Sequence, residues 1–330
     1  MAEFLTFDTD LTAVANAIRV KGGTSAQLIY PSGFVSAIQA IQTGITPKLV
    51  VTTTPGAAIT ATPAEGFKVV KGTAGADGMC TLELPKAGTW HVTAMANSAS
   101  NSQHIVIGTQ NMLLPLYHDT FANNTWEEII TVCRTGIAPD SWAVGDSKTM
   151  NIGGTAYQVD IIGKNHDEYA DGSGTAPLTF QLHDCYSEAK QMYSTNLSGL
   201  GWKNTDMRLA YLPAILALMP AEVQNGIRAV NKKTSEGGNS TTIETVSDTL
   251  FLLSEVEIFG TASSSVAGEG SQYDYYKAGN PKIKKREGVD EFWWERSSAS
   301  GGMFCRVRAN GQAGASNASS SLGVSFAFCF

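Results

Sequence analysis

The sequence predicts a multidomain protein of the α+β and all-β classes, with a short helical N-terminal module, a small β-sandwich and a larger mixed C-terminal domain. Apolar residues recur at helical spacing near the N-terminus, and short β-prone segments then follow at intervals of roughly ten residues. Beyond them, helical and β-prone segments are mixed. A chain of 330 residues is also too long for one compact core of ordinary size. We place the three domains at residues 1–45, 46–112 and 113–330.

Residues 1–45 are predicted to form two short helices. The first carries apolar residues at positions i, i+3, i+4 and i+7, which are Leu11, Val14, Ala15 and Ile18. Gly22-Gly23 ends it, and the second helix runs from Pro31 to just before Gly44. Helices of about three turns are too short to be stable alone. They must pack on each other, on a neighbouring domain or on copies of the chain, so the module is expected to attach or oligomerise the protein.

Residues 46–112 are predicted to form a small β-sandwich that acts as a spacer. Gly, Pro, Asn and Asp residues separate its short β-prone segments, a pattern typical of this architecture. The segments are Leu49–Val51, Ile59, Phe67–Val70, Cys80–Leu84, Trp90–Ala94 and Ile105–Ile107.

Residues 113–330 begin with a helix that Thr125 and Glu128 should cap reciprocally, and that ends near Gly136. A further helical stretch, 206–225, is interrupted by Pro213 and Pro220. Segment 260–291 is rich in Gly, Ser, Tyr and Lys without periodicity, so we expect a surface loop there. The β-prone segments are Lys148–Ile152, Tyr157–Ile162, Leu178–Leu182, Ile227–Lys233, Thr241–Ser247 and Leu250–Leu253.

The C-terminal stretch combines two hydrophobic ends with a centre of small residues. Phe292–Arg296 opens it, and Val324, Phe326, Phe328 and Phe330 close it; we call these ends the aromatic frame. Between them most residues are Ser, Ala, Gly or Asn, which bury too little apolar surface to form a core of their own. This arrangement favours a rigid frame that displays replaceable side chains at a surface, and it suits recognition better than catalysis.

Composition narrows the function classes. A net charge of −7 argues against a general nucleic-acid binder, and the basic run Lys282–Arg286 is expected to be a solvated loop. The five cysteines are odd in number and lack zinc-ligand spacing, so neither a disulfide framework nor a metal site is favoured. Cys305 and Cys329 have hydrophobic neighbours and are expected to be buried free thiols. No cofactor motif was found.

The first residues of the chain and its hydropathy indicate where the protein is expected to be located. The first ten residues, MAEFLTFDTD, are acidic where a signal peptide needs a basic region and an apolar stretch. No run of about 18 apolar residues is present, so we expect no membrane insertion. A protein made in the cytoplasm whose composition resembles that of extracellular proteins fits a virion component.

Two N-terminal segments resemble known families. The run LTAVANAIRVKGGTSAQLIYPSGFVSAIQAI resembles a leader of tail and tail-fibre proteins from phages of Gram-positive hosts. This resemblance implies attachment to a virion or to sister chains. The phrase LPKAGTWHVTA resembles the late hairpin of immunoglobulin-like modules, which implies an Ig-like spacer, although the Cys…Trp…Cys spacing of antibody domains is missing.

The C-terminal domain resembles the C-type-lectin-fold variable proteins of diversity-generating retroelements. The residues that carry the resemblance are Trp142–Asp146, Val159–Asp167, Thr249–Gly260, Phe292–Ser297 and Gly323–Phe328. The resemblance implies a C-type lectin fold in which scattered positions near the C-terminus are rewritten to vary the ligand face. Carried over to this chain, the exposed, ligand-binding positions are Ser298, Ala299, Ser300, Gly302, Met303, Arg306, Arg308, Gln312, Gly314, Ala315, Ser316 and Ser319.

Residue patterns add to this implied ligand face. Arg306 and Arg308 alternate with apolar residues, so they should share the outward face of a strand, where they either grip anionic groups or merely solvate the strand. Asn310-Gly311 marks a tight turn. Tyr273, Tyr275 and Tyr276, between Gly and Ser residues, are expected to be exposed and to support binding.

We therefore expect a receptor-binding protein of a phage tail or tail fibre, not an enzyme. Its partners are a host cell-surface protein or glycan, other tail proteins and further copies of itself, with a trimer favoured. The Glu-Pro-Asn and Trp-Asn-Asp motifs of calcium-dependent lectins are missing. Three alternatives stay open: a bacterial surface adhesin of the same fold, a formylglycine-generating-type enzyme using Cys305 and Cys329, and a purely structural tail protein.

Overall fold

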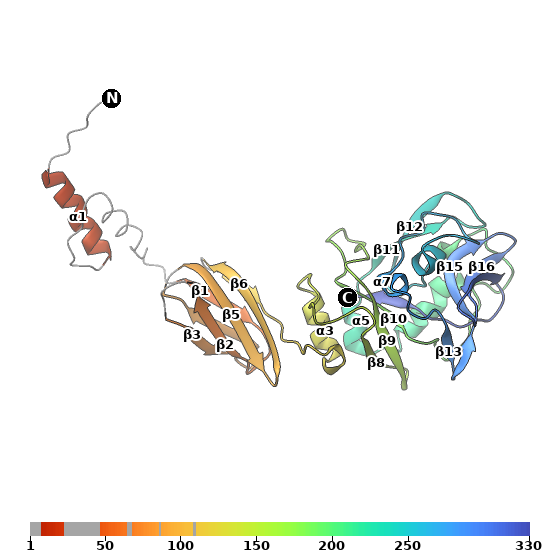
Figure 1. The fold of residues 1–330 in the computed structure, drawn as a ribbon, viewed down its shortest axis with the longest axis horizontal. Helices are drawn as coiled ribbons and strands as arrows, with labels where there is room; N and C mark the ends of the chain where they lie inside the picture. The colour runs from red at the N-terminus through yellow and green to blue at the C-terminus, as the bar shows by residue number, and fades with distance from the viewer. Residues whose placement is uncertain (1–7, 23–46, 65–67, 86, 108–109) are drawn as a thin grey trace, which may run out of the picture. The chain divides into compact units, whose positions relative to one another are not determined.

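The computed structural model describes residues 8–22, 47–64, 68–85, 87–107 and 110–330. These residues are mostly β, in several sheets with few short helices, which confirms the predicted mixture of α+β and all-β structure at the coarse level. The chain divides into two units, Met1–Leu116 and Tyr117–Phe330 (Figure 1). The second unit thus starts at Tyr117, where the sequence placed the boundary after residue 112.

The first unit begins with helix α1 (Asp8–Gly22), the first of the two helices that were predicted. It ends at the glycine pair, and Ala15 and Ile18 from its apolar stripe are buried. Val14, which was assigned to the same stripe, is instead half exposed. The second predicted helix, Pro31 to Gly44, lies outside the described residues.

The rest of the first unit forms two sheets. A three-stranded sheet has the order β4-β1-β7, and a four-stranded sheet has the order β3-β2-β5-β6 (Figure 1). Strands β1 and β7 are parallel, whereas the other pairs are antiparallel. The strands are β1 (Lys48–Thr52), β2 (Ala58–Pro63), β3 (Val70–Thr73), β4 (Met79–Glu83), β5 (Gly88–Ala96), β6 (Ala99–Ile107) and β7 (Gln110–Leu113).

The core of this unit lies between the two sheets. Leu49 and Val51 of β1 share one hydrophobic cluster with Trp90 and Val92 of β5. Burial alternates along β1 and β4, as expected for strands with one face on the core. The sequence indicated six of the seven strands, although β3 starts at Val70 rather than residue 67. Strand β7 was not predicted.

The second unit contains two larger sheets, two hairpins and several short helices. The larger sheets have the orders β18-β10-β9-β8 and β15-β16-β17, and the hairpins are β11-β12 and β13-β14. The first sheet comprises β8 (Ser147–Ile152), β9 (Thr155–Lys164), β10 (Leu178–Leu182) and β18 (Ala327–Cys329). The second comprises β15 (Trp293–Ala299), β16 (Met303–Val307) and β17 (Ala313–Asn317). The hairpin strands are β11 (Val230–Ser235), β12 (Ile243–Asp248), β13 (Lys284–Arg286) and β14 (Val289–Glu291).

The helices of the second unit are short. They are the 3-10 turns η1 (Phe121–Asn123) and η2 (Trp202–Asn204), the π-helical turn η3 (Met207–Tyr211), and the α-helices α3 (Trp126–Cys133), α4 (Leu212–Leu216), α5 (Ala221–Gly226), α6 (Glu255–Phe259) and α7 (Asp274–Lys277). Helix α3 begins with the predicted capping box, in which the Thr125 side chain accepts from the Glu128 backbone and the Glu128 carboxylate accepts from the Thr125 backbone. Pro220 separates α4 from α5 as predicted. Pro213 does not interrupt the helical stretch, because it occupies the first turn of α4, where its missing N–H costs nothing.

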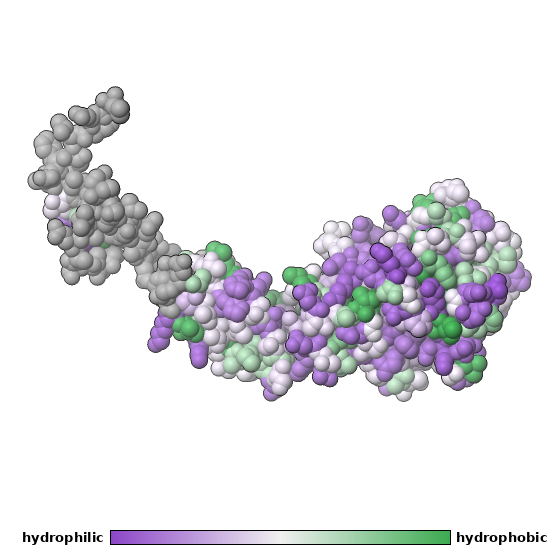
Figure 2. Space-filling view, in the orientation of Figure 1, coloured by the Kyte–Doolittle hydropathy of each residue, from purple (hydrophilic) through white to green (hydrophobic). Residues whose placement is uncertain are grey.

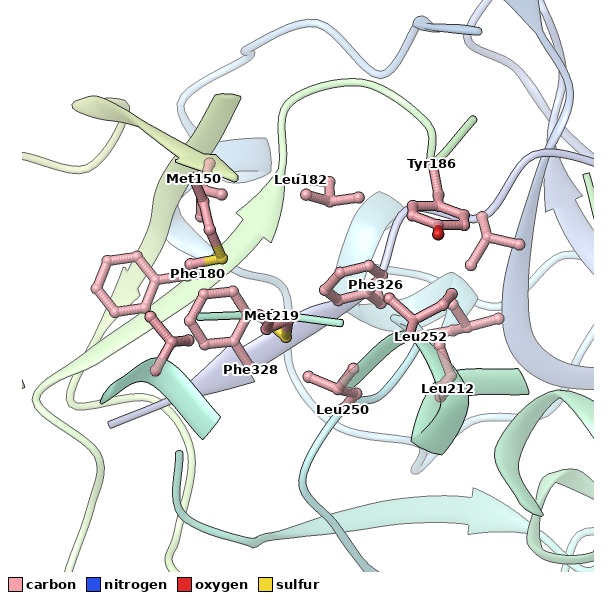
Figure 3. Close-up of a cluster of buried hydrophobic side chains, with 14 of the residues drawn as sticks. Met150, Phe180, Leu182, Tyr186, Leu212, Met219, Leu250, Leu252, Phe326 and Phe328 are labelled. Atoms are coloured by element: carbon pink, nitrogen blue, oxygen red, sulfur yellow. The ribbon is translucent and has the colours of Figure 1, made fainter. Parts of the chain in front are cut away.

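The main core packs helices against the β8-β10 sheet. Phe180 of β10, Phe328 of β18 and Leu250 belong to one buried cluster, and Figure 3 shows their side chains pointing toward one another. Apart from the exposed Phe292, the aromatic frame is part of the interior: Val324, Phe326, Phe328 and Phe330 are buried. The intervening Ser325, Ala327 and Cys329 are buried too, so this last segment is covered on both faces.

The prediction of a surface loop at 260–291 is wrong. This segment contains α7 and the β13-β14 hairpin, and Tyr273, Tyr275, Tyr276 and Glu269 within it are buried. The run Lys282–Arg286, expected to be a solvated loop, contains the whole of β13. The Lys284 ammonium is buried and donates hydrogen bonds to the carbonyls of Leu182 and His183. Tyr273, Tyr276 and Lys284 can be buried because a distant part of the chain supplies a hydrogen-bond partner to each.

A buried ion network holds this segment and the aromatic frame together. Lys232 of β11 contacts Asp167 at 2.6 Å and Glu257 at 2.8 Å. Arg296 of β15 forms a two-pronged pair with Glu257. Although burial alone would raise the pKa of both carboxyls, the neighbouring cations outweigh it, and the pKa of Asp167 falls to about 2.

None of the helices within the described ranges combines the length and apolarity that a membrane crossing requires.

Candidate functional site

The β15-β16-β17 sheet carries most of the predicted ligand-binding positions. Strand β16 pairs with β15 on one side and β17 on the other. In Figure 1, β15 and β16 lie apart from β8 and β9 within the second unit. The indole N–H groups of Trp293 and Trp294 donate to the carbonyls of Lys282 and Lys190 at 2.9 and 2.8 Å. Because adjacent strand residues point to opposite faces, these bonds fix β15 on both sides.

Nine of the predicted positions are exposed or partly exposed on this sheet and its connections. We call them the display surface: Ser300, Gly302, Met303, Arg306, Arg308, Gln312, Ala315, Ser316 and Ser319. The first two lie in the β15–β16 turn, and Arg308 and Gln312 lie in the β16–β17 turn. That turn is tight, as Asn310-Gly311 predicted, with backbone hydrogen bonds from Gly311 to Arg308 and from Arg308 to Gln312. These nine residues thus lie on one three-stranded sheet and its connections, at both ends of β16 and on both faces of the sheet.

Three predicted positions are not exposed. Ser298 and Ala299 lie in β15, every residue of which is buried, because this strand is covered on both faces. Gly314 is buried beneath the side chain of Arg308. The expectation that these three residues face solvent is wrong.

The expected exposure of three tyrosines is also wrong. The Tyr273 hydroxyl donates to the buried carboxylate of Asp167 at 2.8 Å, and its ring stacks on His166. The Tyr276 hydroxyl donates to the Gln181 side chain at 2.6 Å, and Tyr275 packs edge-on against Tyr276. Burial raises the pKa of all three hydroxyls. These three tyrosines stabilise the interior. The flanking Gly and Ser residues, which suggested a binding loop, do not indicate this burial.

Gly302 belongs to the display surface but cannot be freely replaced. Its φ is +77°, and a Cβ atom there would lie 2.5 Å from the backbone oxygen of Asn196. We expect Gly302→Ala to lower the free energy of unfolding by about 1–3 kcal/mol, because the backbone strain and the clash both have to be relieved. Urea denaturation followed by tryptophan fluorescence measures this. Gly301→Ala is the matched control, since φ is +69° there but the nearest atom is the Met303 Cε at 3.8 Å. Equal losses for the two variants would show that the clash has no effect.

An Asp–His pair lies on a different part of the second unit. The carboxylate of Asp160 accepts from the Ser147 hydroxyl and lies 2.7 Å from the His183 Nδ1. His183 is followed directly by Asp184 and Cys185 in the sequence, but its partner is Asp160 of β9. The side chain of His183 is 52% exposed, and that of Asp160 is buried. The hydrogen bond to Asp160 raises the pKa of His183.

This pair predicts a pH-dependent contribution to stability. Because the folded-state pKa of His183 is raised, the charged pair stabilises the fold below the ordinary imidazole pKa, and the effect is lost as the pH rises through the folded-state value. His183→Gln should therefore cost more stability at about pH 5.5 than at about pH 9, by less than about 1 kcal/mol because the imidazole is half exposed. Urea titrations at both pH values measure it. His118→Gln is the control, since the bonds between His118 and Asn124 use the His118 backbone; a pH-independent loss for His183→Gln would contradict the prediction.

The five cysteines are all buried and free, which confirms the expectation for Cys305 and Cys329. Burial raises the pKa of both thiols, and the neighbouring carboxylates raise it further. Cys305 lies near Glu255, whereas Cys329 lies near Asp167 and Thr179. A thiol with a raised pKa carries little of the nucleophilic thiolate form.

A group of buried carboxyls lies beneath β15 and β16. The Glu255 carboxylate accepts from the backbone N–H groups of Ser263, Ser264 and Ser265 and from two of their hydroxyls. Glu295 is fully buried, and neither of its oxygens has a hydrogen-bond partner among residues 110–330. Burial raises the pKa of Glu295 well above its ordinary value, and the charges of Glu255 and Glu269 add to this. Within the described ranges, no three His, Cys, Asp or Glu side chains are placed to hold a metal ion.

Comparison with protein families finds one match. Residues 179–330 match the family described as Domain of unknown function (DUF6273). The matched segment starts in β10 and includes the whole β15-β16-β17 sheet, but not α3, β8 or β9. A search of curated proteins found no match.

Proposed function

We propose that this protein is a receptor-binding protein of a phage tail, made in the host cytoplasm and carried in the virion. Its C-terminal domain, with a C-type lectin fold, binds a host surface protein or glycan through the display surface. The N-terminal module attaches the chain to other tail proteins and to copies of itself, with a trimer favoured, and an Ig-like sandwich acts as a spacer.

One observation carries the proposal: nine exposed or partly exposed residues lie on one sheet and its connections, and an entire strand of that sheet is fixed in the interior. Strand β15 is buried along its whole length and both tryptophans are hydrogen-bonded. Changes on the display surface can therefore alter what the sheet contacts while the core beneath stays the same. A stable scaffold with exposed connections is the usual arrangement for variable recognition.

Two further features support the fold and the mode of binding. Strand β18 near the end of the chain returns to the sheet of β8, β9 and β10, so the C-terminal segment is tied into the domain, and most of the display surface lies on a separate three-stranded sheet. On the face drawn in Figure 2, apolar residues of the second unit form small areas separated by polar ones. We infer that the ligand is bound through mixed polar and apolar contacts.

The enzyme alternative receives less support. A formylglycine-generating-type reaction needs a pair of reactive cysteines, whereas Cys305 and Cys329 are fully buried with raised pKa values and contact different carboxylates. Thiols in such surroundings behave as small hydrophobic residues.

Cell binding by the full-length protein tests the proposal. We expect labelled protein to bind intact cells from a panel of Gram-positive bacteria, and the triple variant Ser300→Tyr, Met303→Glu, Gln312→Tyr to bind at least about tenfold less, because contact residues at an interface centre each contribute more than about 1 kcal/mol. The matched control replaces three exposed residues outside the sheet, Ser141→Tyr, Thr155→Tyr and Ala156→Glu. Binding that survives the first set, or that is absent on every cell tested, contradicts the proposal.

Diversification of the display surface has its own test in the DNA. We expect a near-copy of the 3′ end of this gene close by, next to a reverse transcriptase gene. The two copies should differ only where the template has adenine, in codons of the display surface.

A further inference from the structure

Arg306 and Arg308 lie side by side on the display surface because of a glycine. Arg306 of β16 is the register partner of Gly314 of β17. A Cβ atom on Gly314 would lie 2.8 Å from the Nε and 3.5 Å from the Cζ of Arg308. The Arg308 side chain thus crosses the space that any other residue at 314 would fill. Both guanidinium groups are brought to the same part of the sheet.

Contacts with neutral groups orient Arg306. Its guanidinium carbon lies 4.1 Å from the centre of the Phe292 ring, and its Nε donates to the carbonyl of Ala315 at 3.2 Å. The ring stacks on one face of the guanidinium, and the carbonyl takes one of its five donors. The two terminal nitrogens keep their donors for another partner.

Neither arginine has an acidic partner in the described part of the chain. Four other arginines of the second unit, Arg208, Arg228, Arg286 and Arg296, each pair with an Asp or Glu. Burial lowers the pKa of Arg306, and the positive charge of Arg308 lowers it further, which shows that the two charges act on each other. Two neighbouring cations without a counter-charge, in a protein of net charge −7, repel each other.

We propose that Arg306 and Arg308 form a binding site for an oxyanion group, phosphate or carboxylate, carried by the surface polymer that the display surface recognises. The inference rests on the proposed function and names the class of ligand. A guanidinium group offers two parallel donors that match the oxygens of such groups. An oxyanion between the two side chains attracts both guanidinium groups, and its negative charge offsets their mutual repulsion.

Binding of defined polymers to the full-length protein tests this inference. The probes are a poly(glycerol phosphate), a polygalacturonate and neutral dextran, measured by calorimetry at low and at physiological ionic strength. We expect the protein to bind an acidic polymer and not dextran, with affinity that falls as salt is added. The phosphate and carboxylate probes distinguish the two sources of the oxyanion.

Variants separate a built site from general charge attraction. Arg306→Gln with Arg308→Gln should weaken binding of the acidic polymer at least about tenfold, because charge-assisted hydrogen bonds are lost. The control pair Lys71→Gln with Arg134→Gln also removes two exposed cations, but neither lies on the β15-β16-β17 sheet. This pair should leave the affinity for the acidic polymer within about twofold. Gly314→Ala should weaken binding several-fold although it removes no charge, because its Cβ displaces Arg308.

Three results would overturn the inference: equal binding of dextran and acidic polymers, equal losses for the two double variants, or no binding of either acidic polymer. A failure of this inference can be told apart from a failure of the proposed function. If cell binding is lost in the Ser300, Met303, Gln312 variant but kept in the double arginine variant, the display surface binds its receptor without an oxyanion at this pair.

Discussion

Replacing Arg296 with methionine will destabilise the second unit by about 3–5 kcal/mol, because the change leaves a buried carboxylate without its main partner. Arg296 is fully buried and forms a two-pronged pair with Glu257. It also donates to the carbonyls of Leu252 and Glu269, at 2.9 and 2.8 Å. Methionine fills much of the volume but supplies none of these donors. Lys232 would then be the cation still paired with the two carboxylates of Asp167 and Glu257.

Urea denaturation of the full chain, followed by tryptophan fluorescence, measures this loss. Five of the six tryptophans belong to the second unit, and Trp90 belongs to the first. Arg134→Met is the matched control, since Arg134 is exposed at the end of α3, and it should change stability by less than about 0.5 kcal/mol. Similar losses for the two variants would mean that the buried network contributes nothing specific. The observed pairing would then be incidental to stability.

Replacing Phe180 with alanine will cost the second unit about 3–5 kcal/mol, because it leaves a cavity at the centre of the aromatic core. Phe180 is fully buried, and its ring centre lies 5.3 Å from those of both Phe328 and Phe330. It also contacts Trp126 and Phe121 from the α3 side, so one side chain joins helix, sheet and C-terminal strand. Figure 3 shows it facing Phe328.

The same denaturation experiment measures this loss, and near-ultraviolet circular dichroism reports the packing of the remaining aromatic rings. Phe180→Leu should cost clearly less, since it keeps most of the volume. Phe292→Ala is the surface comparison, because Phe292 is 36% exposed and should cost about 1 kcal/mol or less. A loss for Phe180→Ala no greater than that for Phe292→Ala would contradict the central role of the ring.

Local signals allowed much of the second unit to be predicted. The capping box of helix α3 depends on Thr125 and Glu128, which are only three residues apart. The strands between Lys148 and Leu182 are rich in β-branched and aromatic residues, and this composition predicts strands. The aromatic frame was recognisable because such large apolar side chains have to be buried. The turn at Asn310-Gly311 likewise follows from two adjacent residues.

The failures concern burial that distant residues decide. Segment 260–291 has the composition of a loop, but Tyr273 reaches Asp167 and Lys284 reaches the carbonyls of Leu182 and His183. No local pattern shows that such partners exist about a hundred residues away. Ser298 was expected to be exposed because the resemblance to variable proteins implied it, whereas β15 is covered on both faces. Which residues of a small-residue stretch reach the surface is thus settled by packing, not by composition.

Glu295 makes folding of the second unit a proton-consuming step. Its carboxyl is ionised in the unfolded chain at neutral pH, but in the folded chain burial raises its pKa and favours the neutral acid. Folding therefore takes up protons at this residue at pH values between the ordinary pKa and the raised one, and the associated stability declines as the pH climbs above the ordinary carboxyl range. Asp167 and Glu257, whose pKa values are lowered, act in the opposite sense. Acidification toward the ordinary carboxyl range thus stabilises the second unit at Glu295, whereas further acidification below that range destabilises it at Asp167 and Glu257.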